Sequence, residues 1–366
     1  MTVTHIYNPE HDLAMAYGGE GFTPPAAGRG MRAGLGFLPA FWACEGDYVL
    51  VDDVAEMERE ALRFREFLPK VTLISWSQLP DIVCNHEDLE IKPWGWDMAL
   101  RHQLLRAGIP PNNLPKAEEV EKVRMLSHRR TSIPLLKHLA STLSDMVGER
   151  HEAKSLDEVR QWMSQEGTVV CKSPWSSSGR GVRFVETTLD ANLEGFLRNV
   201  LVHQGSIIVE PCYHRLMDFA MEFMVGDDEV LYEGLSLFDT RNGAYSGNVL
   251  ATEEGKWELL GTVIPQEVVR PLVTALETGL AETFKGYQGP LGVDMMVVEE
   301  KGCRKVHPCV EVNVRSTMGW AAIAVALRTR GRFDTMRVAC QDGRYHLCLE
   351  NKKTTMLKTF IDETTT

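Results

Sequence analysis

The residues best suited to chemistry lie on two apolar segments late in the chain. Asp294 is the one acid in the run Gly-Val-Asp-Met-Met-Val-Val that begins at Gly292. In the second segment Glu311, Asn313 and Arg315 alternate with valines, so a strand would place all three side chains on one face. Carboxylate and amide oxygens are hard ligands that suit Mg²⁺, and a neighbouring guanidinium could face phosphates. The alternative is a sheet face that only contacts solvent.

A lysine followed by a serine- and glycine-rich loop is the second candidate. Residues 169–172 form a short apolar run that ends in Lys172, and the loop follows directly. Glycine lets backbone N–H groups approach phosphate oxygens, serine hydroxyls add donors and the lysine adds a charge. The pattern predicts phosphate binding, with a plain hairpin turn as the alternative. The loop residues concerned are Ser176, Ser177, Ser178, Gly179 and Gly181.

A third segment, residues 206–210, reads as a strand that ends in Glu210 and Pro211. The free backbone groups at such a strand end could bind an adenine, and the carboxylate of Asp218 could reach ribose hydroxyls. Most acid–proline strand ends are structural, and that is the alternative here.

Composition limits the classes of protein to consider. The chain has 366 residues, which favours two or three domains, and a formal net charge of -12, which argues against a general nucleic-acid binder. The eight cysteines are scattered singly without metal-ligand spacing, so we expect reduced thiols and a cytoplasmic protein. No signal peptide and no apolar stretch of membrane-spanning length is evident, so no membrane association is expected.

The elements that would position these residues follow an α/β (α+β) pattern. Short apolar runs predict strands at residues 3–7, 48–51 and 71–75, with helices at 53–67 and 96–107. Ser155, followed by Glu158, predicts a capped helix that opens a small α/β unit ending near residue 210. Later strands are expected at residues 219–225, 230–238, 291–299, 306–312 and 344–350, and helices at 265–284 and 318–328. The expected domains are residues 1–115, 116–212 and 213–366.

Taken in this order, the motifs of residues 124–330 resemble those of the ATP-grasp superfamily. The resemblance implies an ATP-grasp fold after an N-terminal Rossmann-like (pre-ATP-grasp) domain. It implies that Lys172 contacts the α- and β-phosphates, and that residues 176–181 form a lid over the phosphates. It further implies that Glu210 and Cys212 flank the adenine, that Asp218 holds the ribose, and that Mg²⁺ (or Mn²⁺) is bound by Asp294, Glu311 and Asn313.

The resemblance also suggests residues close to the transferred phosphate. Arg315 matches the arginine that biotin carboxylase-like members carry two residues after the asparagine, so Arg315 and Lys172 are the expected catalytic residues. Either Arg129 or Arg130 resembles the basic residue that touches phosphate before the small subdomain. D-alanine ligases have an arginine where this chain has Gly292, so their substrate chemistry is not transferred to it.

The activity implied by the resemblance is that of a ligase. ATP would convert a small-molecule carboxylate to an acylphosphate, which an amine or a thiol then attacks, most simply forming a carbon–nitrogen bond. A kinase that phosphorylates a hydroxyl and a nucleotide sensor without turnover are the alternatives. A homodimer is one option among oligomeric states that the sequence leaves open.

Three further segments are open to two interpretations each. Residues 8–12, Asn-Pro-Glu-His-Asp, follow the first strand and are either a substrate site or the capped start of a helix. Residues 28–33 fit GxGxxA, but a Pro-Pro pair rather than a strand precedes them, so a dinucleotide loop is disfavoured. Arg29 and Arg32 in that segment could hold an anionic substrate. The glycine-rich residues 243–248 are either a hairpin turn or a substrate contact.

Overall fold

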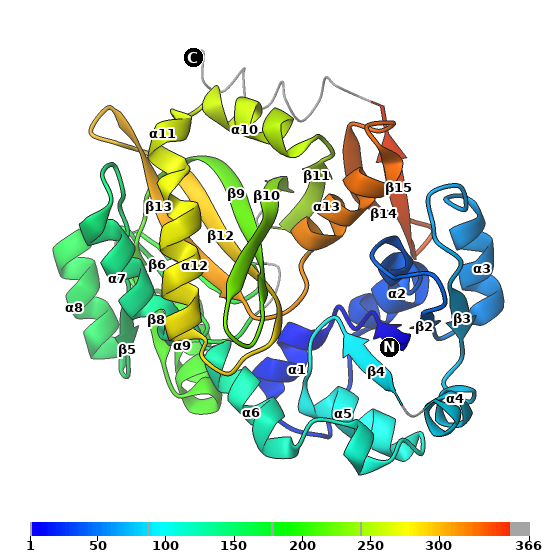
Figure 1. Cartoon of the computed structure of the whole chain (residues 1–366). Coiled ribbons are helices and arrows are strands. Elements are labelled where there is room, and N and C mark those ends of the chain that lie inside the picture. Colours follow the sequence, from blue (N-terminus) through cyan, green and yellow to red (C-terminus); the bar gives the residue numbers. More distant parts are fainter. Residues whose placement is uncertain (1, 87, 177–178, 187, 242–243, 352–366) are drawn as a thin grey trace. The chain divides into compact units, whose positions relative to one another are not determined.

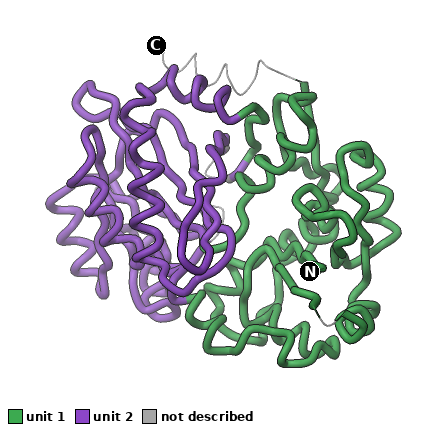
Figure 2. The backbone as a smooth tube through the Cα atoms, viewed as in Figure 1, with its two compact units in different colours: residues 1–124, 246–252, 314–354 green, residues 125–245, 253–313, 355–366 purple. Residues whose placement is uncertain are grey.

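The computed structural model of the chain describes residues 2–351 except 87, 177–178, 187 and 242–243. The described residues cluster into two compact units, which are coloured separately in Figure 2. Unit 1 comprises residues within 1–124, 246–252 and 314–354, and unit 2 comprises residues within 125–245 and 253–313. The first unit therefore includes two segments from late in the chain, and the expected third domain, 213–366, is divided between the two.

Unit 1 contains a four-stranded parallel sheet in the order β3-β2-β1-β4. Its strands are β1 (Thr2–Ile6), β2 (Tyr48–Leu50), β3 (Thr72–Ile74) and β4 (Leu89–Pro93). Val49 and Val51 face one hydrophobic core while Leu50 faces another, because side chains alternate along a strand. Both faces of the sheet are thus covered, which confirms the buried parallel strand predicted at residues 48–51.

Helices and a second, small sheet complete unit 1. Strands β14 (Thr335–Gln341) and β15 (Arg344–Glu350) pair with each other, and β14 also pairs with the end of β11 (Ala244–Val249). The GxGxxA segment lies inside a helix whose N-cap is Pro25, so it does not form the strand-to-helix turn of a dinucleotide site. The helices are α1 (His11–Tyr17), α2 (Ala26–Leu35), α3 (Val54–Leu62), α4 (Leu79–Asn85), α5 (Met98–Arg106) and α13 (Met318–Thr329), with α6 (Ala117–Leu126) following α5 in the chain.

Helix α2 approaches β15 so closely that one glycine leaves no room for a side chain. A Cβ atom added at Gly34 would lie 2.2 Å from the carbonyl oxygen of Tyr345. We expect Gly34→Ala to lower the free energy of unfolding by about 1–3 kcal/mol, because strain exceeds the helix-propensity gain of about 1 kcal/mol. Urea denaturation would measure this. The control is Gly195→Ala in α9 (Ala191–Gln204), where no atom lies within 4 Å and a small gain is expected; equal effects of the two changes would contradict the prediction.

Unit 2 contains a small antiparallel sheet in the order β5-β8-β6-β7. Its core also takes in α8 (Leu156–Glu166) and α9, and Cys171 in this core is a free thiol, like every other cysteine of the chain. The predicted cap is confirmed, because the hydroxyl of Ser155 accepts a hydrogen bond from the backbone N–H of Glu158. The strands are β5 (His151–Ala153), β6 (Val169–Lys172), β7 (Val182–Val185) and β8 (Ile207–Pro211).

The larger sheet of unit 2 is antiparallel, in the order β13-β12-β9-β10. Its strands are β9 (His214–Val225), β10 (Val230–Arg241), β12 (Gly289–Glu300) and β13 (Cys303–Asn313), and helix α12 (Pro271–Thr283) lies across one face (Figure 1). A short helical turn, η3 (Arg129–Ser132), and α7 (Ile133–Thr142) pack against β13.

One helix of unit 2 is interrupted where the sequence predicted continuity. The expected helix at 265–284 is two helices, α11 (Gln266–Val269) and α12 (Pro271–Thr283). Pro271 marks the break, because its ring nitrogen has no N–H to donate to the preceding turn, although Arg270 before it keeps helical backbone angles. Among the described residues no single helix could cross a membrane, although α10 (Glu253–Gly261) with α11 and α12 meets the length and composition requirement as a bent pair.

Candidate nucleotide and metal site

Lys172 stands at the end of β6, where the sequence predicted it, and lies within a buried charge cluster. Its Nζ is 2.5 Å from one carboxylate oxygen of Glu210 on the neighbouring strand β8. The other oxygen of Glu210 accepts a hydrogen bond from Nε of Arg150 at 2.5 Å. Although burial opposes ionisation of Glu210, the two cations hold its pKa at about 2. The cluster therefore consists of one carboxylate shared by two cations.

Arg150 was not identified from the sequence. Its guanidinium is fully buried and also donates to the hydroxyl of Ser132 and to the carbonyl oxygens of Cys309 and Val310. It thus ties β8 to η3 and to β13, and a cation with that many partners positions the strands around Lys172. No local pattern marks it, because its partners are 18 to 160 residues away along the chain.

Arg129 links the glycine loop to the predicted metal ligands. Its Nη2 is 2.5 Å from Oε1 of Glu311, and its Nη1 donates to the hydroxyl of Ser176 at 2.9 Å and to the carbonyl oxygen of Ser173. The buried Nε of Arg129 has no hydrogen-bond partner among the described residues. Arg130 points elsewhere, with Nη1 3.5 Å from Glu152. Of the two arginines that the sequence left open, Arg129 is the one beside the loop and the carboxylate.

The loop after Lys172 is closed by a backbone bond. The N–H of Ser173 donates to the carbonyl oxygen of Gly181 at 2.8 Å, and a Cβ at Gly181 would lie 2.4 Å from Cβ of Ser176. Glycine is therefore required there by close contact. Gly179 has a positive φ of 70°, which glycine adopts without strain. The predicted contacts of Ser177 and Ser178 fall outside the described residues.

The three predicted metal ligands share one face of the larger sheet. Asp294 on β12 pairs with Glu311 on β13, and Gly292 pairs with Asn313. Opposite residues in an antiparallel pair project to the same side, so the two carboxylates and the amide lie together. Nδ2 of Asn313 donates to Oδ2 of Asp294 at 3.1 Å, which confirms that their side chains meet.

This donor set fits a hard divalent cation. Its oxygens come from two carboxylates and one amide, as Mg²⁺ prefers, and Oε2 of Glu311 makes no hydrogen bond to a described residue while Oε1 is held by Arg129. Among the described residues no group of three or more His, Cys, Asp and Glu side chains is suited to a metal. Asp294 and Glu311 therefore have no third described ligand of these four types beside them. Mg²⁺ bound to so few protein ligands would complete its shell with water and phosphate.

The predicted ribose and adenine residues have defined partners. Oδ2 of Asp218 accepts from Arg215 at 2.5 Å and from the hydroxyl of Thr240 at 3.0 Å, and burial raises the pKa of this carboxyl. The N–H of Cys212 donates to the carbonyl oxygen of Thr168 at 3.1 Å. The backbone of Cys212 therefore has only its carbonyl left for a ligand. Contacts of these residues with a nucleoside stay predictions.

His307 was also missed by the sequence analysis. It lies on β13 and is completely buried, with neither ring nitrogen hydrogen-bonded to a described residue. Burial lowers its pKa to about 3, so the ring is neutral at ordinary pH. Its ring packs edge-on against Tyr213 with centroids 5.6 Å apart. The neutral imidazole therefore fills the space beside the charge cluster without adding a charge.

Arg315 lies beyond the end of β13, whose last residue is Asn313. It belongs to unit 1, where its guanidinium makes two hydrogen bonds with the carboxylate of Asp12, at 2.7 and 2.6 Å. Asn313 is the last residue of its segment in unit 2, so the chain passes from one unit to the other directly after it. The catalytic role of Arg315 stays a prediction, and Asp12 is a partner that the sequence did not suggest.

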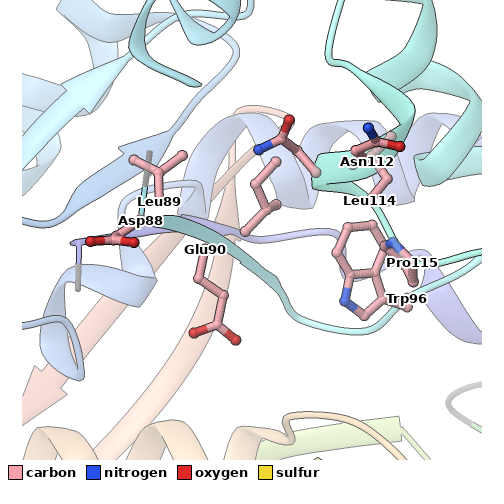
Figure 3. A pocket seen from close by; sticks show the side chains of 9 residues that line it. Asp88, Leu89, Glu90, Trp96, Asn112, Leu114 and Pro115 are labelled. Atoms are coloured by element: carbon pink, nitrogen blue, oxygen red, sulfur yellow. The ribbon is translucent and has the colours of Figure 1, made fainter. Parts of the chain in front are cut away.

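Two pockets are lined entirely by described residues of unit 1. One, of about 550 Å³, runs along the edge strand β4, with Asp88 at one end and Trp96, Leu114 and Pro115 at the other (Figure 3). The second, of about 480 Å³, is lined by residues of the Asn8–Asp12 segment and by Arg32. The second pocket therefore includes two features that the sequence analysis had left open.

Comparison with known proteins identifies the fold. No protein-family model matches the sequence, and no curated protein matches it either. Among solved structures, N5-carboxyaminoimidazole synthetase from Staphylococcus aureus, complexed with ADP, matches with a TM-score of 0.50 at 11% identity, over 99% of this chain and 96% of that one. A biotin carboxylase from Campylobacter jejuni matches with a TM-score of 0.49 at 13% identity, over 89% and 70% of the chains. An ATP-grasp superfamily protein from Archaeoglobus fulgidus gives 0.47 at 14%, over 96% and 100%.

The chain thus has the ATP-grasp fold, as the order of its motifs predicted. At this level of identity the likeness concerns the fold alone, and what the chain binds and catalyses is argued from its own residues.

Proposed function

We propose that this chain is an ATP-dependent ligase that converts a substrate carboxylate to an acylphosphate and joins it to an amine or a thiol. The observation that carries the proposal is the position of Arg129, which joins Ser176 of the glycine loop to Glu311 of the acidic strand face. Phosphoryl transfer needs a phosphate-binding loop, a cation and metal-binding oxygens close together, and the contacts of Arg129 join the candidates for all three. The ADP bound to the Staphylococcus aureus synthetase of the same fold supports a nucleotide as the ligand.

The proposed nucleotide contacts follow from these neighbours. Lys172 and the unpartnered Nε of Arg129 would bind phosphate oxygens, with the loop of residues 176–181 above them. The carbonyl oxygen of Cys212 and the end of β8 at Glu210 would meet the adenine, and Asp218 would accept from the ribose. A bound Mg²⁺ would neutralise charge on the transferred phosphate. Asp294, Glu311 and Asn313 would hold it, with Oε2 of Glu311 available to the cation while Oε1 stays bonded to Arg129.

In the proposed reaction the substrate carboxylate oxygen attacks the γ-phosphorus and the bond to the β-phosphate oxygen breaks, so ADP leaves. The amine or thiol then attacks the acyl carbon, loses its proton and expels inorganic phosphate. Lys172 and Arg129 hold the transferred group in place and stabilise its charge. The Nε of Arg129 is available for that purpose while Nη2 stays bonded to Glu311, so Arg129 links the proposed phosphate contact to the proposed metal ligand.

Product analysis with Mg·ATP tests the proposal. The protein is incubated with pairs drawn from amino acids, small peptides and dicarboxylates on one side and amines and thiols on the other. A ligase releases ADP and phosphate together and forms a product lighter than its two substrates by one water. A phosphorylated acceptor without phosphate release would establish a kinase instead, and a failure of Mg·ATP to bind at all, measured by calorimetry, would refute the nucleotide site.

A further inference from the structure

The second pocket of unit 1 lies where parallel sheets bind ligands. Three residues of its lining follow strands directly: Asn8 follows β1, Trp76 follows β3 and Asp97 follows β4. Asp52, which follows β2, accepts a hydrogen bond from the indole of Trp76. The pocket therefore lies at the carboxyl ends of the four strands. Open α/β sheets bind ligands at that edge, next to the point where the strand order reverses. Asn8 spans this point between β1 and β4, since its Nδ2 donates to Gly95 at 2.9 Å and to Asp97 at 3.2 Å.

The polar residues of this edge are not used to cap the helix that they begin. Helix α1 has Glu10 at its N-cap without any side-chain cap hydrogen bond. His11 contacts Asp97 at 3.2 Å, and Asp12 pairs with Arg315. A helix does start at His11 with Asp12 in its first turn, as one of the two interpretations of residues 8–12 expected, but no side chain caps it and these side chains have other partners.

Glu10 carries the pocket's unsatisfied hydrogen-bonding group. Its side chain is 6% exposed, its Oε1 accepts from Nη1 of Arg32 at 2.7 Å, and its Oε2 has no hydrogen-bond partner among the described residues. A buried carboxylate oxygen without a donor is costly, so such a group in a pocket wall indicates a missing ligand donor. Burial raises the pKa of Glu10, the guanidinium of Arg32 lowers it, and the charges of Asp97 and Asp52 raise it, with a net increase.

The charges around the pocket favour a cationic donor. Its lining includes three carboxylates, Glu10, Glu20 and Asp97, against the guanidiniums of Arg32 and Arg106, and the imidazoles of His102 and His11 contact Glu20 and Asp97 respectively. Arg32 is shared with Asp52, which is outside the lining, so its charge is already offset. A neutral hydroxyl would satisfy the hydrogen bond but leave the excess negative charge, whereas an ammonium group would satisfy both.

The rest of the lining suits a ligand with an apolar body. Phe22, Trp76, Ala14 and Leu100 supply apolar surface beside the carboxylate. Arg106 lies exposed at the rim and makes no ion pair or hydrogen bond with a described residue. The chemistry of the whole lining is thus that of a receptor for a primary amine, with a cation available should the ligand also carry a carboxylate.

We propose that this pocket binds the ammonium group of a primary amine and that Glu10 receives it through Oε2. The assignment of that amine as a substrate of the ligase rests on the proposed function, whereas the binding itself does not. The pocket then recognises the amine-bearing partner within unit 1, on a different unit from the proposed phosphate and metal residues.

Calorimetry with matched ligand pairs tests the proposal on the full chain. The probes are 2-phenylethylamine against 2-phenylethanol, and L-leucine against 2-hydroxy-4-methylpentanoate. We expect the amine of at least one pair to bind at least about tenfold more tightly than its hydroxyl analogue, because the hydrogen bond is charge-assisted. The first pair reports on a simple amine and the second on an amino acid. Equal binding within both pairs, or no binding of either amine, overturns the proposal.

Two variants locate the effect. Glu10→Gln should weaken binding of the preferred amine by at least about tenfold. The control is Asp52→Asn. Asp52 also pairs with Arg32 but does not line the pocket, so this change should alter the affinity for the amine by less than about threefold. Unchanged binding by Glu10→Gln overturns the proposal; if that variant fails to fold, judged by its circular dichroism and thermal melting, the comparison within pairs on the unaltered protein decides. Amine binding without ligation would refute the proposed ligase activity but support the amine pocket. Ligation that Glu10→Gln does not affect would support the ligase activity but refute the amine pocket.

Discussion

Glu311→Gln is expected to lower Mg²⁺-dependent turnover of ATP by roughly 10²–10³-fold, the usual loss when a group that stabilises transferred charge is removed. Glutamine keeps the shape and one oxygen of Glu311 but not its charge, so the predicted cation would lose one of two carboxylate ligands. Turnover is measured as ADP release with the acid and amine pair that supports it. Binding of Mn²⁺ in the presence of ADP, followed by electron paramagnetic resonance, gives a second readout that does not depend on knowing the substrates.

The control for this experiment lies on the neighbouring strand. Glu299 on β12 is exposed and pairs in register with Arg304, so Glu299→Gln makes the same chemical change away from the predicted ligands. We expect it to leave Mn²⁺ binding and turnover within about twofold, since an exposed charge contributes little. Glu311→Gln that binds Mn²⁺ as tightly as the control would refute the metal assignment. A loss of thermal stability in Glu311→Gln alone would instead indicate that Arg129 needs its partner for folding.

Much of the fold could be predicted because it depends on local patterns. The short apolar run at residues 48–51 identified a buried strand, and the spacing of Ser155 and Glu158 identified a helix start. Alternation along residues 311–315 placed Glu311 and Asn313 on one face, as the register of β12 and β13 confirms. In each case the information lies within a few residues, so the periodicity of a strand or helix is enough.

The parts that were missed depend on contacts between distant residues. Arg150 and Glu210 are 60 residues apart, and Arg129 and Glu311 are 182 apart, so no spacing rule connects them. The choice between Arg129 and Arg130 was likewise decided by η3, which turns one side chain toward the loop and the other toward Glu152. Strand β13 ends at Asn313 and the chain enters unit 1 at residue 314, so the alternation expected from a strand does not extend to Arg315.

The second large effect is expected on stability, from Glu210→Gln. This change removes the carboxylate that offsets Arg150 and Lys172, whose side chains are 0% and 10% exposed. Leaving buried charges uncompensated typically costs about 3–5 kcal/mol. Urea denaturation at pH 7, followed by circular dichroism, should show a decrease of that size. Glu194→Gln, which breaks exposed pairs with Arg160 and Arg198, is the control and should cost less than about 1 kcal/mol.

The pH dependence of this difference distinguishes lost charge pairing from lost packing. The pKa of Glu210 is lowered from 4.5 to about 2 in the folded state, so its charge stabilises the fold fully above pH 4.5 and progressively less as pH falls toward 2. Glutamine does not titrate. The difference in the free energy of unfolding between the unaltered protein and Glu210→Gln should therefore be largest near pH 7 and shrink on acidification. A difference that stays constant down to pH 3 would mean that the side chain of Glu210 acts by its shape and not by its charge. Lys172→Met leaves Glu210 paired with Arg150, so it should lower the free energy of unfolding by less than Glu210→Gln does. It should also weaken nucleotide binding. The two variants together therefore distinguish the structural role of Glu210 and Arg150 from the proposed phosphate-binding role of Lys172.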